Sequence, residues 1–149
     1  MVYNCILVGF DGSEASRRAV EKAAMIARRL DARLLVVTVV PGPSVLLGEL
    51  LLPEVFPTED IIKAAREGLD KLAEEIKEKY NINVDTLVVE GDAAEGLLET
   101  AKSNSCSLIV VGRRGRGLAE KLLGSVSSKL VNIARGVDVL VVEPGETRS

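Results

Sequence analysis

The sequence contains no histidine and no tryptophan, and aromatic residues make up 3% of its 149 positions. Without histidine, neither a Ser-His nor a Cys-His nucleophile pair can form, and a His-ligated zinc site is excluded as well. The scarcity of aromatic rings also argues against a protein that recognises single-stranded RNA or DNA by stacking its bases. Several enzyme and nucleic-acid-binding classes are therefore excluded before any motif is considered.

An excess of positive charge is also missing, because 19 Lys and Arg stand against 22 Asp and Glu and give a net charge of −3. Nonspecific binding to nucleic acid needs a basic surface that displaces counterions. Hydrophobic residues make up 47% of the chain, which indicates a folded core rather than disorder. We therefore expect a folded protein without a nucleic-acid partner.

Cysteine occurs twice, as Cys5 and Cys106, with no CxxC spacing. We interpret the pair as two buried thiols in a reducing cytosol. Asn4 and the polar turn at 9–11 interrupt the apolar start, so no signal peptide is predicted. The longest uncharged stretch, 34–48, is broken by prolines and is too short to span a bilayer. We expect a soluble, cytoplasmic protein with no membrane partner.

What the sequence does have is a series of five short apolar runs that predict β-strands. They cover residues 5–8, 34–40, 84–89, 108–111 and 137–142. The run at 34–40 is nearly continuous, which is typical of a strand buried on both faces of a parallel sheet.

Four helices are predicted between these strands. The first follows Ser13, which is predicted to be its N-cap, and carries apolar residues at helical spacing. The second covers Thr58–Tyr80 and has the clearest amphipathic repeat. Asp92 and Glu95 predict a capping box for a short third helix. The fourth covers 125–134, with Gly136 as its C-terminal stop signal.

Five strands that alternate with four helices, without an internal repeat, predict parallel pairing through right-handed crossovers. The fold class is therefore α/β, an open doubly wound parallel sheet with helices on both faces. A closed eight-stranded barrel would need a much longer chain. Residues 1–149 are expected to form one domain.

The segment between Pro43 and Pro57 does not fit this alternation. Its apolar residues begin at Val45 and end at Phe56, and they are too many for a solvated loop. One interpretation is a short helix that covers a sheet edge. The others are a surface for a partner, such as a second subunit, and a flap over a binding site.

Ligands of open α/β sheets bind beyond the carboxyl ends of the strands. The loop after the first strand, 9–13, combines two glycines, a carboxylate and a hydroxyl. The loop after the fourth strand is rich in glycine and arginine and leads to Gly124 and Ser125 at the start of a helix. Glycine lets backbone N–H groups approach an anion, and a helix N-terminus adds unpaired donors. We favour a phosphate site, and the alternative is a solvated loop before an ordinary helix.

The common phosphate motifs do not match this loop. A P-loop requires GxxxxGK[ST], which is absent, and the dinucleotide fingerprint GxGxxG fails because Leu118, Ala119 and Glu120 follow Gly117. Gly112 to Gly115 followed by Gly124-Ser125 instead resembles the G-x2-G-x9-G-[ST] nucleotide motif of the universal stress proteins. The resemblance extends over almost the whole chain, from the opening strand with its Asp-Gly-Ser-Glu turn to the closing strand.

The resemblance implies a strand order of 3-2-1-4-5, with ATP or a related adenine nucleotide such as AMP between strands one and four. Asp11 would lie near the ribose or a phosphate-bound Mg²⁺, the backbone of Val39 would bind the adenine edge, and the two glycine loops would hold the ribose and phosphates. The cofactor-binding residues implied in this way are Gly9, Asp11, Val39, Gly112, Arg113, Arg114, Gly115, Gly124, Ser125, Val126 and Ser127.

One departure from the family motif is visible, because eight residues separate Gly115 from Gly124 where ATP-binding members have nine. We expect a nucleotide-binding regulatory protein without rapid turnover, since no general base accompanies the phosphate loop. The alternative is a dimeric interaction protein of the same family that has lost nucleotide binding. An enzyme is the third interpretation.

In the family the last strand often forms a two-fold dimer, so a homodimer is expected through the apolar strand that begins at Val137 and ends at Val142.

Overall fold

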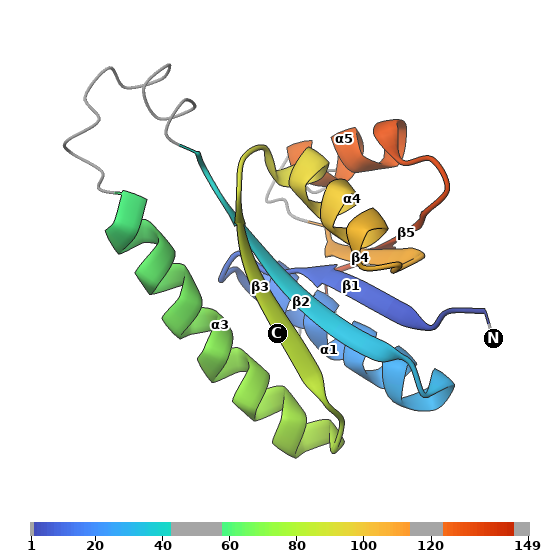
Figure 1. Ribbon diagram of the computed structural model, residues 1–149. Helices are drawn as coiled ribbons and strands as arrows, with labels where there is room; N and C mark the ends of the chain where they lie inside the picture. Colours follow the sequence, from blue (N-terminus) through green and yellow to red (C-terminus); the bar gives the residue numbers. More distant parts are fainter. Residues whose placement is uncertain (1, 43–57, 114–123, 145–149) are drawn as a thin grey trace, which may run out of the picture.

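The computed structural model describes residues 2–42, 58–113 and 124–144. This part of the chain contains five strands and four helices (Figure 1). In chain order they are β1 (Cys5–Gly9), α1 (Glu14–Leu30), β2 (Arg33–Val40), α3 (Thr58–Tyr80), β3 (Val84–Glu90), α4 (Ala93–Ser103), β4 (Leu108–Gly112), α5 (Ser125–Ile133) and β5 (Asp138–Val142). All the predicted strands and helices are present, and the apolar and capping patterns therefore located them correctly.

All five strands run parallel in one sheet of order β3-β2-β1-β4-β5. This confirms the doubly wound α/β class and the strand order that the resemblance implies. The chain adds strands on one side of β1 first and then crosses to the other side to form β4 and β5. Connections therefore diverge between β1 and β4, which is the place where open sheets bind ligands.

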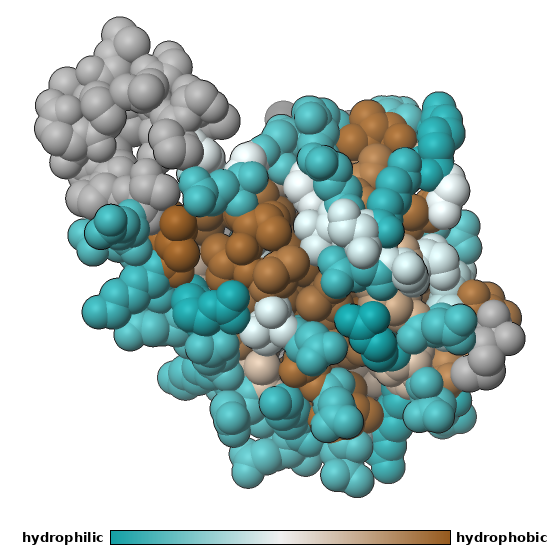
Figure 2. All heavy atoms as spheres, viewed as in Figure 1, coloured by the Kyte–Doolittle hydropathy of each residue, from teal (hydrophilic) through white to brown (hydrophobic). Residues whose placement is uncertain are grey.

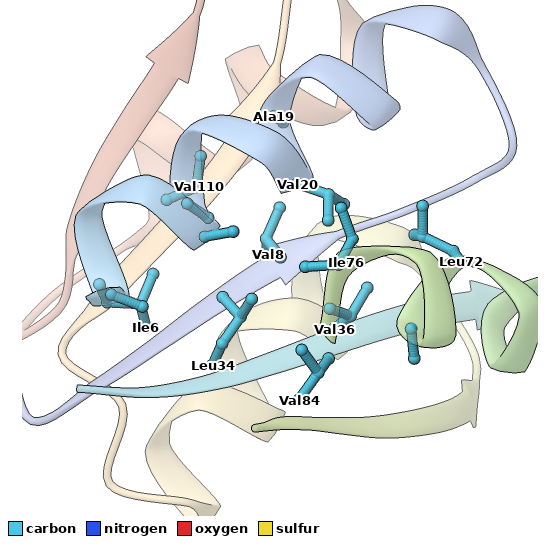
Figure 3. Close-up of a cluster of buried hydrophobic side chains, with 14 of the residues drawn as sticks. Ile6, Val8, Ala19, Val20, Leu34, Val36, Leu72, Ile76, Val84 and Val110 are labelled. Carbon is cyan, nitrogen blue, oxygen red and sulfur yellow. The ribbon is translucent and has the colours of Figure 1, made fainter. Parts of the chain in front are cut away.

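Helices α1 and α3 cover one face of this sheet, and α4 and α5 cover the other (Figure 1). On the first face, Val8 of β1 packs in one cluster with Val20 of α1 and Ile76 of α3 (Figure 3). On the second face, Leu7 belongs to a cluster that includes Leu130 of α5. Because successive side chains of a strand point to opposite faces, β1 supplies both halves of the core.

The second helical layer leaves part of the sheet less covered. Helix α4 lies over β1, β2 and β4, whereas Leu87 and Val89 of β3 are half-buried at the border of this core. Figure 2 shows hydrophobic side chains at the surface over this region of the sheet. The apolar segment 43–57, predicted to cover a sheet edge or to meet a partner, lies outside the described residues.

The end of α5 differs from its prediction. The helix ends at Ile133, and Ala134 is its C-cap in an extended conformation, so Gly136 does not occupy the capping position. Gly136 has a φ of +79° in the connection that follows. The start of β5 is fixed beside β4 by the hydrogen bond from the Asp138 N–H to the Ser107 carbonyl (2.9 Å). Gly136 therefore serves the turn that leads the chain to the start of β5, and it does not end α5.

The two cysteines form a disulfide, which corrects the prediction of two free thiols. Cys5 begins β1, and Cys106 lies just before β4, the neighbour of β1 in the sheet. Their pairing follows from the register, which sets Ile6 opposite Leu108 and leaves the two cysteine Cα atoms 4.4 Å apart. Their predicted burial is confirmed, since each is 2% exposed. A sequence separation of 101 conceals this contact until the strand order is known.

Charged side chains connect α1 to α3 on the outside of the first layer. Glu21 of α1 accepts hydrogen bonds from the Lys79 ammonium (2.6 Å) and the Tyr80 hydroxyl (2.8 Å) of α3, and Arg17 pairs with Glu75. The hydrogen bonds from Lys79 and then Tyr80 hold the pKa of Glu21 below its ordinary value of 4.5. Glu21 is therefore a site at which pH acts on the contact between the two helices.

We expect Glu21→Gln to lower the free energy of unfolding by about 0.5–1 kcal/mol at pH 7, the usual size for a partly exposed ion pair. A carboxyl group with a depressed folded-state pKa stabilises the protein above its unfolded-state pKa, and this contribution is lost as the pH falls through the folded-state value. Urea unfolding should therefore show the difference at pH 7 and lose it progressively as the pH falls below 4.5, the ordinary pKa of this carboxyl group. The control is Glu78→Gln, at an exposed position of α3, which should leave the free energy of unfolding unchanged at neutral and at acidic pH. An effect of Glu21→Gln that does not depend on pH would contradict the explanation.

Candidate functional site

Three helices begin beside the switch point. Helix α1 follows β1, α4 follows β3 and α5 follows β4, and each starts at the carboxyl edge of the sheet because it leads back along the strands. A pocket lies at this edge, between the ends of β1, β2 and β4 and the first turns of α4 and α5. It occupies the position at which ligands bind in open parallel sheets.

Most of the predicted site residues line this pocket. They are Gly9, Asp11, Val39, Gly112, Gly124, Ser125, Val126 and Ser127. Arg113 is not part of the lining, because its guanidinium pairs with Glu143 after β5 (3.2 Å). Arg114 and Gly115 lie outside the described residues. The roles toward a nucleotide that the resemblance implies for these residues stay predictions.

The lining also contains residues that sequence reasoning missed, namely Phe10, Ser16, Val37, Ala93, Leu97 and Val111. A periodicity argument could have found Val37, because residues two apart on a strand share a face and Val39 was already a candidate. Ala93 and Leu97 are one helical turn apart on α4. Nothing in the sequence shows that this helix borders the pocket.

The loop between β1 and α1 holds Asp11 in a defined orientation. Its Oδ1 accepts hydrogen bonds from the Ser13 N–H and the Ser16 hydroxyl, both at 2.9 Å. The Ser13 hydroxyl in turn accepts from the Ser16 N–H (3.1 Å) and forms the predicted N-cap of α1. Gly12 has a φ of +88°, a conformation that glycine adopts without strain. This turn places the carboxylate at the pocket.

The main chain of Val39 is oriented toward the same space. The Phe10 N–H donates to the Val37 carbonyl (2.9 Å), on the β1 side of β2, and the Gly91 N–H donates to the Val40 carbonyl (2.9 Å), on the β3 side. Since backbone groups alternate along a strand, the N–H and C=O of Val39 face the β1 side. Paired residues of β1 and β2 end at Gly9 and Val37, so Val39 lies beyond the end of β1.

The N-termini of the three helices differ in their capping. The Ser13 side chain caps α1, and the Asp92 side chain caps α4 by accepting from the Glu95 N–H (3.0 Å). This is the N-cap half of the predicted capping box, whereas the Glu95 carboxylate pairs with Lys129. The hydrogen bond from the Glu95 N–H, followed by the one from Lys129, holds the pKa of Asp92 below its ordinary value. Gly124 provides no side-chain cap for α5, and the first turn of α5 contains no acidic residue. The positive end of the α5 dipole therefore remains unneutralised by its own cap or first turn.

Helix α5 is fixed to the sheet and to α4 by two polar contacts. The Ser127 hydroxyl, on a residue that is 3% exposed, donates to the Gly112 carbonyl at the end of β4 (3.1 Å). Lys129 pairs with Asp92 (3.1 Å) and Glu95 (2.8 Å) in the first turn of α4. These contacts fix the distance between the two helical walls of the pocket, and they commit the Ser127 hydroxyl to the protein itself.

The described part of the chain comprises residues 2–42, 58–113 and 124–144. Within them, no group of three or more Cys, Asp or Glu side chains has the arrangement to hold a metal ion. No helix in these same ranges is both long enough and apolar enough to cross a membrane.

Comparison with known proteins agrees with this geometry. The model of the universal stress protein family matches residues 3–143. Among similar proteins is universal stress protein YxiE of Bacillus subtilis (strain 168), which is 37% identical over 141 residues, covering 89% of this chain and 95% of that protein. The match to the family model therefore includes the sheet, the four described helices and all the pocket residues.

Two solved structures of nucleotide complexes are also similar. The universal stress protein from Archaeoglobus fulgidus in complex with dAMP has a TM-score of 0.70 and 26% identity, over 95% of this chain and 99% of that chain. A universal stress protein in complex with cAMP has a TM-score of 0.71 and 27% identity, over 95% of this chain and 98% of that chain. Fold, pocket and sequence agree, and this chain belongs to the universal stress protein family.

Proposed function

We propose that this protein binds an adenine nucleotide, ATP or AMP, in the pocket and acts in the stress response as a regulatory protein without rapid turnover. The observation that carries the proposal is the open N-terminus of α5. Of the three helices that begin beside the pocket, α1 and α4 have side-chain caps, whereas α5 lacks one and begins inside the lining. An uncapped helix N-terminus that faces a pocket is a site for an anion.

The donors at this terminus suit a phosphate group. The N–H groups of Ser125, Val126 and Ser127 belong to the first turn, where backbone donors have no partner within the helix. The dipole of α5 adds attraction for negative charge there. At the other side of the pocket, the main-chain N–H and C=O of Val39 offer one donor and one acceptor, which suits the edge of an adenine ring. The universal stress proteins solved with dAMP and cAMP support an adenine nucleotide as the ligand class.

Slow or absent turnover is part of the proposal. The sequence provides no histidine, and Oδ1 of the lining carboxylate Asp11 accepts two hydrogen bonds from its own loop. These two bonds occupy Oδ1, so this oxygen is not available to activate a water molecule. A Mg²⁺ ion that accompanies ATP would be held mainly by the phosphates, with Asp11 at its side.

The proposal is tested by titration calorimetry with ATP plus Mg²⁺ and with AMP, on the wild type and on Gly124→Asp. Aspartate at this N-cap would accept from the first-turn N–H groups, as Asp92 does in α4, and would repel a phosphate. We expect at least a tenfold loss of affinity together with an unchanged or slightly higher melting temperature. Gly124→Ala is the matched control and should retain binding.

Absence of binding by the wild type at high micromolar ATP and AMP would overturn the proposal. It would favour the alternative of an interaction protein that has lost nucleotide binding, for which the short spacing before Gly124 is the motivating observation. Equal affinity in Gly124→Asp and the wild type would instead show that the phosphate lies away from α5.

The proposal includes a homodimer that forms through β5. This strand is at the edge of the sheet. Its Asp138 N–H and Val142 carbonyl bond to the β4 side, so by alternation the backbone groups of Val139 and Val141 face outward. Val139→Pro should remove an outward donor while leaving the bonds to β4 in place, and light scattering should then detect a monomer. A folded variant that remains dimeric would place the contact elsewhere.

A further inference from the structure

The pocket has two chemically different ends. One end is the first turn of α5 with its backbone donors. The other end, on the side of β2 and α4, is formed by aliphatic side chains, namely Val37, Val39, Ala93 and Leu97. None of these side chains can donate or accept a hydrogen bond. This end therefore suits a flat aromatic base, whose edge the main chain of Val39 can bind, and the phosphate is left to α5.

We propose that Leu97 sets the size of the base that this protein accepts, an inference that rests on the proposed nucleotide binding. Leu97 comes from α4 and is 3% exposed, although it lines the pocket. Its side chain reaches Gly9, because a Cβ built at Gly9 would lie 3.0 Å from Cδ1 and 3.4 Å from Cδ2 of Leu97. The leucine therefore occupies the space that a side chain at position 9 would need.

Gly9 is required for this space and not for its backbone conformation. It is the last residue of β1 and pairs with Val37 in the regular parallel register. The positive-φ glycines of the described chain are Gly12, Gly91 and Gly136, and Gly9 is not among them. An alanine could keep the strand, but carbon atoms pack at about 3.5–4.0 Å, so Leu97 would have to move.

The contact between the two residues predicts a selectivity. While Leu97 is held against Gly9, the apolar end accepts an adenine base and excludes a base enlarged by an apolar group. Removal of the isobutyl group opens this end without touching α5. The phosphate and sugar contacts should then be unaffected, so only the selectivity for the base should change.

The test uses titration calorimetry with AMP, N6-benzyl-AMP and ribose 5-phosphate. The wild type should prefer AMP to N6-benzyl-AMP by about tenfold or more, and in Leu97→Ala this ratio should fall at least tenfold, because a pocket discriminates single apolar groups by about 10–200-fold. The affinity for ribose 5-phosphate should be the same in both proteins. Leu98→Ala is the matched control, since Leu98 is the next residue of α4 and is partly buried in the same core but is not in the lining.

A second pair of variants tests the contact with Gly9. Gly9→Ala should lower the affinity for AMP about tenfold, because the new methyl group displaces Leu97. The double variant Gly9→Ala with Leu97→Ala should recover most of this lost affinity. Such a non-additive result is expected of residues in contact and not of independent damage. Circular dichroism establishes that each variant is folded, and Leu97→Val replaces Leu97→Ala in both arms if the latter does not fold.

The outcomes separate this inference from the proposed function. A wild type that binds neither AMP nor ATP overturns both. A wild type that binds AMP, with the same selectivity ratio in Leu97→Ala as in Leu98→Ala and additive effects at Gly9 and Leu97, overturns the role of Leu97 alone.

Discussion

Reduction of the Cys5–Cys106 disulfide should lower the free energy of unfolding by about 4 to 5 kcal/mol, because the bond closes a long loop in the unfolded chain. The two residues are 101 positions apart, and loop-closure entropy grows with this separation. Both cysteines are 2% exposed, so a reductant should reach the bond slowly under native conditions. Guanidinium unfolding with and without dithiothreitol measures the difference directly.

A titration of free thiols establishes whether the unreduced protein contains the disulfide, which the comparison of oxidised and reduced protein requires. Protein that is unfolded without a reductant should show no free thiol if the disulfide is present. Cys106→Ala should resemble the reduced wild type in stability, apart from a smaller packing loss, and its unfolding should no longer respond to dithiothreitol. Two free thiols in the unreduced protein, or equal stability in both redox states, would contradict the expectation and restore the interpretation of two buried thiols.

Gly112→Ala should destabilise the protein by about 3 kcal/mol, at the upper end of the usual cost of overpacking. A Cβ at Gly112 would overlap the carbonyl of Ala15, with the carbonyl carbon only 2.7 Å away. These are backbone atoms in the first turn of α1, so relief requires a shift of the whole helix from β4. Because the Ser127 hydroxyl donates to the Gly112 carbonyl, the shift should also disturb the start of α5 and weaken the proposed nucleotide binding.

Gly68→Ala is the matched control for this substitution. Gly68 lies inside α3, and a Cβ built there meets no heavy atom within 4 Å. Alanine should therefore stabilise the protein by about 0.5–1 kcal/mol through its better helix propensity. Thermal unfolding should show opposite signs for the two variants. A similar small effect of both would mean that α1 can move away from β4 at little cost.

The candidate site illustrates what a local pattern can predict. Gly124 and Ser125 were identifiable because a glycine followed by a hydroxyl residue at a helix start is a pattern of adjacent residues. Asp11 belongs to the loop after the first strand, which was noted for its glycines, carboxylate and hydroxyl, and the family resemblance then selected it. Ala93 and Leu97 were not identifiable, because their role depends on where α4 crosses the sheet, and this is set by packing against strands that are distant in the sequence.

Gly112 shows how the same residue can be selected for a different reason. Its position in a glycine loop suggested close approach of the backbone to an anion. The structure adds a requirement that no motif contains, which is the carbonyl of Ala15 from the first turn of α1. Arg113 was assigned to the site by the family resemblance, yet its guanidinium pairs with Glu143.

The sequence by itself determined the elements of this protein, its fold class and its family. Apolar periodicity and capping residues act over a few positions, so strands, helices and two of the three helix caps at the pocket edge could be located from local physics. The tertiary structure alone decided which distant residues meet: the disulfide across β1 and β4, the contact between Gly9 and Leu97, and the clearance between Gly112 and α1. These contacts depend on strand order and on distances of a few ångströms between layers, and no local pattern encodes either.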